Sequence, residues 1–134
     1  MSGTEYLNNY NANRPTILAA LKHYRDKLTT LVKDEEIESG GDALKYDLYE
    51  HLRNTLNALS NLSHPKDADT IFNILQDYNK IICYALSNYD KELNQAKDAA
   101  VLELGYKVLS YSESQEETTL IQSALRFMHC DERP

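Results

Sequence analysis

Pairs of acidic residues three positions apart are the arrangement in this chain that could bind a metal ion. Glu35 with Glu38 and Asp47 with Glu50 have this spacing, and residues three or four apart share one face of a helix. Carboxylates suit Mg²⁺, so the pairs raise the hypothesis of a small metal-dependent all-α nucleotide hydrolase. The inward positions of the helix that carries the second pair are instead Leu44, Leu48 and Leu52. We therefore prefer solvated acids, and we expect no metal and no cofactor.

Histidine offers a second kind of chemistry, phosphoryl transfer. The chain contains His23, His51, His64 and His129. None of them has a second ligand residue at the spacing that metal sites use. The segment from Glu50 to Leu59 resembles the phosphoacceptor helix of histidine kinases, in which a His precedes a basic residue, a small polar pair and a Leu. This resemblance implies a phosphotransfer role for His51. The match departs from the family pattern because Glu50 stands at the position of the family's histidine, and no ATP-binding domain follows.

Tyrosine is the aromatic residue that this chain favours, with ten Tyr, two Phe and no Trp. Tyr combines a rigid apolar ring with a polar tip, which suits protein interfaces. Tyr46 and Tyr84 lie off the apolar stripes of their predicted helices. An acidic run adds a second surface, which is either a solvated face or a docking site for a basic partner. The candidate interface residues are Tyr46, Phe72, Tyr84, Glu35, Glu36 and Glu38.

Net charge and cysteine content limit the class of binding partner and the cellular compartment that we expect. The formal net charge of −7 disfavours nucleic acid and favours a basic protein partner, because affinity for phosphates comes mostly from Lys and Arg. Cys83 and Cys130 are too few and too far apart for a zinc ribbon or a disulfide framework, so we expect two reduced thiols. The first residues do not form a signal peptide, and no stretch approaches the roughly 20 apolar residues of a membrane span. We expect a cytoplasmic protein without a membrane partner.

Apolar residues recur every three or four positions along most of the chain, which predicts helices. Residues 1–13 lack this period and are expected to form a flexible N-terminal lead-in, and residues 131–134 a loose tail. Asn13 is a possible N-cap of the first helix, and Pro15 suits its first turn. This helix should end before Gly41.

Three further helices or more follow from capping residues and breaks. One is predicted from about 42 to 62, and Asp67 or Asp69 caps the next. Its apolar period continues to 111, and we place a break at 87–90, where Ser and Asn offer caps. Gly105 either ends or weakens the fourth helix. Ser114 with Glu117 forms a capping box for the last helix.

The short connections make neighbouring helices antiparallel, which predicts an all-α antiparallel helical bundle of four or five helices in one domain, 14–130. The third helix carries more apolar residues than one bundle stripe needs. Either the last helix or a second copy of the chain covers this surplus, and we prefer the homodimer. The leading functional hypothesis is a non-enzymatic protein that acts through protein–protein binding, as an adaptor, inhibitor, chaperone or immunity-type regulator.

Overall fold

The described part of the chain folds into five helices. The structure, a computed structural model, describes residues 3–38, 43–64, 66–104 and 108–130, with side chains outside 34–47 and 95–117. The helices are α1 (Gly3–Glu38), α2 (Ala43–Leu62), α3 (Ala68–Asp77), α4 (Asn79–Leu104) and α5 (Val108–Phe127). No strand occurs within the described ranges, and the prediction of an all-α helical bundle is confirmed.

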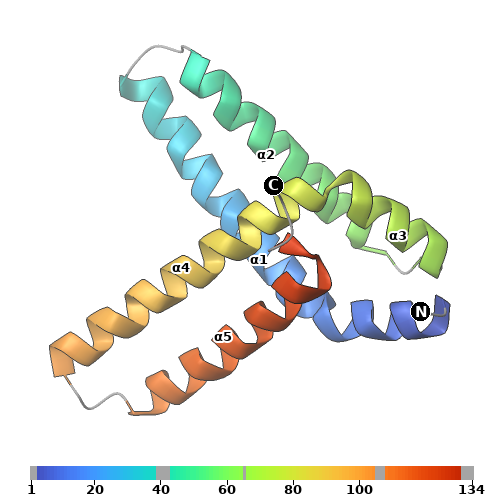
Figure 1. The fold of residues 1–134 in the computed structure, drawn as a ribbon. Coiled ribbons are helices and arrows are strands. Elements are labelled where there is room, and N and C mark those ends of the chain that lie inside the picture. Colours follow the sequence, from blue (N-terminus) through green and yellow to red (C-terminus); the bar gives the residue numbers. More distant parts are fainter. Residues whose placement is uncertain (1–2, 39–42, 65, 105–107, 131–134) are drawn as a thin grey trace.

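Two helical hairpins diverge from a common centre (Figure 1). α1 and α2 form one hairpin, α4 and α5 form the other, and α3 lies beside the N-terminal part of α1. Every helix supplies at least one fully buried aliphatic residue to this centre, and these are Ile17, Leu21, Leu62, Ile71, Ile82, Leu86 and Ile121. Burying one such side chain contributes about 1.5–3 kcal/mol, so this shared core holds the hairpins together.

The N-terminal lead-in is part of the first helix. α1 begins at Gly3, so the helix start predicted at Asn13 is wrong. The reason is tertiary packing, since Tyr10 is only 2% exposed and Tyr6 packs against the core. Asn13 does not cap the helix; its side-chain amide donates to the carbonyl of Asn9 at 2.8 Å and accepts from the hydroxyl of Ser123 at 3.0 Å.

Pro15 lies inside α1 instead of at its start. α1 changes direction within its blue N-terminal part (Figure 1). A proline inside a helix removes one backbone hydrogen bond and its ring clashes with the carbonyl four residues earlier, here that of Asn11. The bend directs the N-terminal segment of α1 across α3 and away from the line of the α1–α2 hairpin.

α2 spans Ala43–Leu62, close to the predicted 42–62. The boundary between the third and fourth helices and the start of the fifth differ from the predicted ones. The break between the third and fourth helices falls at Tyr78, and the predicted break at 87–90 lies inside α4. Backbone hydrogen bonds continue on both sides of Tyr78, so the interruption is local. α4 ends at Leu104, immediately before Gly105. α5 begins at Val108, so the capping box predicted at Ser114 does not start it.

The last helix covers the apolar surplus of the third predicted helix. α5 contributes Ile121, Ala124 and Leu125 to the same buried cluster that contains Ile81 and Ile82 of α4. This is the first of the two predicted alternatives. The width of the apolar surface therefore no longer argues for a second copy of the chain.

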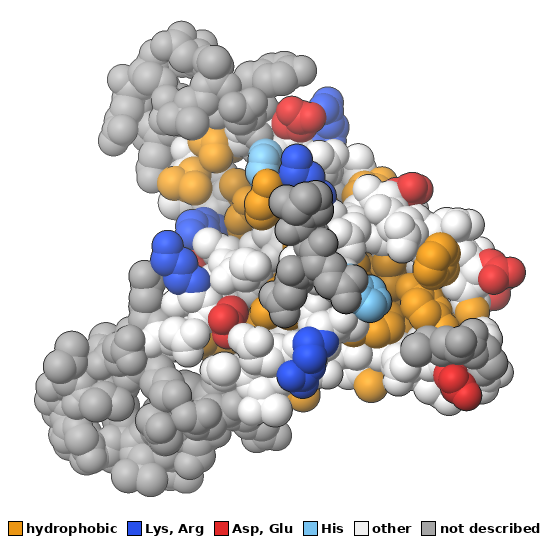
Figure 2. All heavy atoms as spheres, in the orientation of Figure 1, with side chains coloured by type: hydrophobic (Ala, Val, Ile, Leu, Met, Phe, Trp, Pro, Cys, Tyr) orange, Lys and Arg blue, Asp and Glu red, His pale blue; other side chains and the backbone are white. Residues whose placement is uncertain are grey.

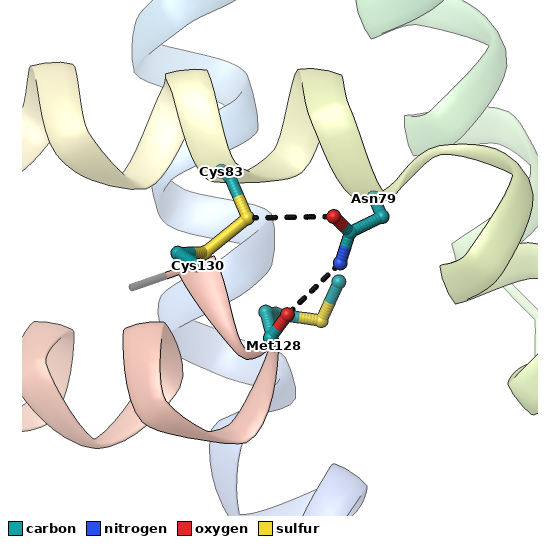
Figure 3. The surroundings of a disulfide bond; sticks show 4 residues. All are labelled: Asn79, Cys83, Met128 and Cys130. Carbon is teal, nitrogen blue, oxygen red and sulfur yellow. Dashed lines mark hydrogen bonds between the residues drawn. A yellow bond between two sulfur atoms is a disulfide. The ribbon is translucent and has the colours of Figure 1, made fainter. Parts of the chain in front are cut away.

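A disulfide joins Cys83 and Cys130, so the prediction of two reduced thiols is wrong (Figure 3). Cys83 lies on α4 and is buried, and the two Cα atoms are 5.6 Å apart. His129, with a φ of 56°, ends α5 in the left-handed conformation and turns the chain toward α4. The side chain of Asn79 donates a hydrogen bond to the carbonyl of Met128 at 2.9 Å and stabilises the same turn. The disulfide was not predicted from the sequence because 47 positions separate the two cysteines.

Candidate functional site

Three aromatic rings from three helices form one surface, which we call the aromatic patch: Tyr6 of α1, Phe72 of α3 and Phe127 of α5. The ring of Tyr6 lies 5.6 Å from that of Phe72, edge to face, and 5.6 Å from that of Phe127. Tyr6 and Phe127 are partly buried, whereas Phe72 is 47% exposed. The patch therefore presents one exposed ring on a base of two packed rings.

The register of α3 explains why Phe72 points outward. Asp67 caps this helix by accepting from the backbone N–H of Thr70 at 2.8 Å, as predicted for Asp67 or Asp69. Ile71, Ile74 and Leu75 then form the buried side of the helix. Successive residues on a helix diverge by about 100°, so Phe72 turns away from this buried side.

Acidic residues lie on the helix segments that carry Tyr6 and Phe72. Glu5 on α1 and Asp69 and Asp77 on α3 are exposed. Residues 3–13 and 68–77 contain these acids and neither Lys nor Arg. Arg126 of α5 is the basic residue adjacent in sequence to Phe127. Figure 2 shows hydrophobic side chains gathered between α3 and the N-terminal part of α1, with acidic side chains along the outer edge. An apolar surface with an acidic edge suits a ligand that is apolar and basic.

A pocket of about 230 Å³ lies on a neighbouring side of the same α1 segment. We call it the basic pocket, and its lining residues are Leu7, Tyr10, Asn11, Arg14, His64, Lys66 and Ile71. Arg14 donates from one guanidinium nitrogen to the carbonyls of Leu62 at 3.0 Å and Ser63 at 3.3 Å. These bonds hold the guanidinium between α1 and the end of α2.

Tyr10 forms the buried wall of the basic pocket. Burial raises the pKa of its hydroxyl, and the nearby Arg14 guanidinium partly offsets the rise through its charge and a hydrogen-bond interaction.

A second aromatic cluster contains His51, the predicted phosphoacceptor. The hydroxyl of Tyr24 lies 3.3 Å from Nδ1 of His51, and the imidazole stacks on Tyr84 at 5.7 Å. Burial and, less strongly, Tyr84 raise the pKa of Tyr24. Half-buried His51 thus has protein partners on its Nδ1 and on its ring face. Its phosphotransfer role stays a prediction.

An ion cluster joins the two hairpins away from these surfaces. Glu92 of α4 accepts from His23 and, at 2.9 Å, from the ammonium of Lys27, both on α1. The hydrogen bond from His23 is the main reason that the pKa of Glu92 is lowered. This arrangement is structural, because it connects α1 to α4 through one carboxylate.

Two of the predicted interface residues, Phe72 and Tyr84, have described side chains, and they contact different rings. Phe72 packs on Tyr6, whereas Tyr84, 42% exposed, stacks on His51. The side chains of the other predicted interface residues lie outside the described part, and these are Tyr46, Glu35, Glu36 and Glu38.

The predicted metal site is only partly visible in the structure. Glu50 is exposed, and the side chains of its three predicted co-ligands lie outside the described part. Among the described residues, no group of three His, Cys, Asp or Glu side chains could hold a metal ion. The metal-hydrolase hypothesis stays a prediction.

Sequence reasoning missed most residues of both surfaces. Tyr6, Leu7 and Tyr10 belong to the segment 1–13, which was expected to be flexible. Their spacing continues through Arg14 to Ile17 with helical period, which is the signal that could have extended the helix. No family model, curated protein or solved structure matches this chain.

Proposed function

We propose that this protein is a non-enzymatic binding module that engages a partner protein through the aromatic patch. The observation that carries the proposal is Phe72, which is 47% exposed although its ring rests on a packed aromatic base. Exposed aromatic side chains in well-packed surroundings are typical of binding hot spots. The ring is held before binding, so little conformational entropy is lost when a partner covers it.

The charges around the aromatic patch define the partner's chemistry. Glu5 is adjacent in sequence to Tyr6, Asp69 lies three positions before Phe72 on α3, and the whole chain has a net charge of −7. Complementary charge favours association and discriminates against like-charged partners. The partner segment is therefore an apolar anchor with Lys or Arg beside it, and raising the salt concentration weakens its binding.

Selection from a random peptide library displayed on phage tests this proposal. The wild type should enrich peptides in which Lys or Arg flanks an apolar residue. Phe72→Ser should weaken the selected peptide about tenfold or more, because truncating a hot-spot aromatic costs about 2 kcal/mol. Leu56→Ser is the matched control, since Leu56 is 46% exposed on α2, and it should bind like the wild type.

Three outcomes contradict the proposal. Selection could enrich acidic peptides or no common pattern, which would refute the partner chemistry. Equal binding by the wild type and Phe72→Ser would show that the aromatic patch is not the site. Equal weakening by Leu56→Ser would show that the loss is not specific to the patch. Thermal unfolding of both variants confirms that each is folded.

The disulfide bears on where such a module acts. None of the described helices is long and apolar enough to cross a membrane. The cytoplasmic location was predicted from the lack of a signal peptide and of a membrane span, and the pairing of Cys83 with Cys130 argues against it. Disulfides persist mainly in oxidising compartments, so we propose an oxidising location. Acid-quenched thiol alkylation in native cells tests this, and two alkylated cysteines would restore the cytoplasmic proposal.

A further inference from the structure

The basic pocket gathers positive charge at one place on an acidic protein. Arg14, His64 and Lys66 line it, and no Asp or Glu does. Among the described residues neither His64 nor Lys66 has an ion-pair partner. Arg14 and Lys66 are cationic side chains that line one pocket without a carboxylate, and like charges repel one another. A bound anion would relieve this repulsion.

The lining of the basic pocket is apolar as well as cationic. Leu7 of α1 and Ile71 of α3 contribute aliphatic walls, and Ile71 belongs to the buried core. The volume of about 230 Å³ is below the roughly 300 Å³ at which pockets for drug-sized ligands begin. The pocket thus suits a small molecule with one anionic group and a short apolar body.

A carboxylate accepts up to four hydrogen bonds, so one carboxylate could accept from both Arg14 and Lys66, which line the pocket.

We propose that the basic pocket binds a small carboxylic acid, with its carboxylate between Arg14 and Lys66 and its short apolar chain against Leu7 and Ile71. A carboxylate fits better than a phosphate because the aliphatic walls would desolvate a phosphate dianion without compensating it. The inference does not depend on the aromatic patch, because neither Phe72 nor Phe127 lines this pocket.

Isothermal titration with hexanoate tests this site, with hexanol and inorganic phosphate as the comparison ligands. Hexanol has the apolar chain without the charge, and phosphate has the charge without the chain. Hexanoate should bind at one site, and each comparison ligand should bind at least about tenfold more weakly, since a hydrogen bond to a charged group is worth about 1.5–3 kcal/mol.

Two variants locate the binding. Lys66→Gln should weaken hexanoate about tenfold, and Lys80→Gln, which removes an exposed lysine on α4, should bind like the wild type. Arg14 is left unchanged, since it also bonds to the end of α2.

Several results would overturn the assignment. Absence of hexanoate binding by the wild type would refute the site, and phosphate or hexanol binding as tightly as hexanoate would refute the ligand class. Wild-type affinity in Lys66→Gln would place the ligand elsewhere. Phe72→Ser should retain wild-type hexanoate affinity, which separates failure of this site from failure of the aromatic patch.

Discussion

Reduction of the Cys83–Cys130 disulfide should destabilise the fold by about 4 kcal/mol. The bond closes a loop between residues 47 positions apart, and it restrains the unfolded chain more than the folded one. In the chain-entropy model the lost entropy is about 2.1 + 1.5R ln n, which is roughly 14 cal/mol/K for this loop. At 25 °C this entropy corresponds to about 4 kcal/mol, within the range seen for native disulfides.

The structure gives reasons to expect that reduction lowers the free energy of unfolding by about this entropic amount, with little change in the contacts of the folded state. Cys83 is buried on α4 and stays packed when reduced, because its neighbours Ile82 and Ala85 belong to the core. The turn that carries Cys130 is also held by the hydrogen bond from Asn79 to the carbonyl of Met128. Reduction therefore leaves the native contacts in place and mainly frees the unfolded chain.

Urea unfolding with and without a phosphine reductant measures the effect. With an m-value of about 2 kcal/mol/M, a loss of about 4 kcal/mol lowers the midpoint by about 2 M. The double variant Cys83→Ala/Cys130→Ala is the control, and its midpoint should not respond to the reductant. Identical midpoints for the oxidised and reduced wild type would refute the entropic argument. Two alkylated cysteines in the denatured, unreduced protein would refute the disulfide itself.

Two further stability changes follow from named contacts. Glu92→Gln removes the carboxylate that accepts hydrogen bonds from His23 and Lys27. It should lower the free energy of unfolding at pH 7, measured by urea unfolding, by about 0.5–1 kcal/mol. The pKa of Glu92 is lowered in the folded state below its ordinary value of 4.5, so this stabilisation is present above that value and is lost as the pH falls through the folded pKa. A difference from the wild type that persists undiminished near pH 3 would contradict the assignment. Leu86→Ala removes a fully buried side chain and should cost about 2–5 kcal/mol, and a loss below about 1 kcal/mol would show that Leu86 is not in the core.

Much of the fold could be predicted because helical periodicity is a local property of the chain. Ile17, Leu21 and Leu28 follow the helical spacing that predicted a helix after residue 13, and all three are buried. Asp67 was recognised as a cap because its hydrogen bond spans three residues. The break at Tyr78 was not predicted, because the neighbouring sequence contains neither Gly nor Pro.

The parts that were missed depend on contacts between distant residues. The N-terminal segment is helical because Tyr6 and Tyr10 meet Phe127, more than a hundred positions later. The basic pocket likewise combines residues 7–14 with residues 64–71. Of the predicted interface residues with described side chains, Phe72 belongs to the aromatic patch and Tyr84 does not. No local pattern contains such pairings, since they arise only when α3 and α5 pack on α1.

The N-terminal segment of α1 carries residues of both candidate surfaces, which decides how their variants must be interpreted. Tyr6 supports the aromatic patch, while Leu7 and Arg14 line the basic pocket on an adjacent side of the helix. A change that loosens this segment removes both surfaces together and identifies neither. Phe72→Ser and Lys66→Gln avoid this ambiguity, because Phe72 lies on α3 and Lys66 in the connection between α2 and α3. If Phe72→Ser loses only peptide binding and Lys66→Gln loses only hexanoate binding, then two independent sites share this segment.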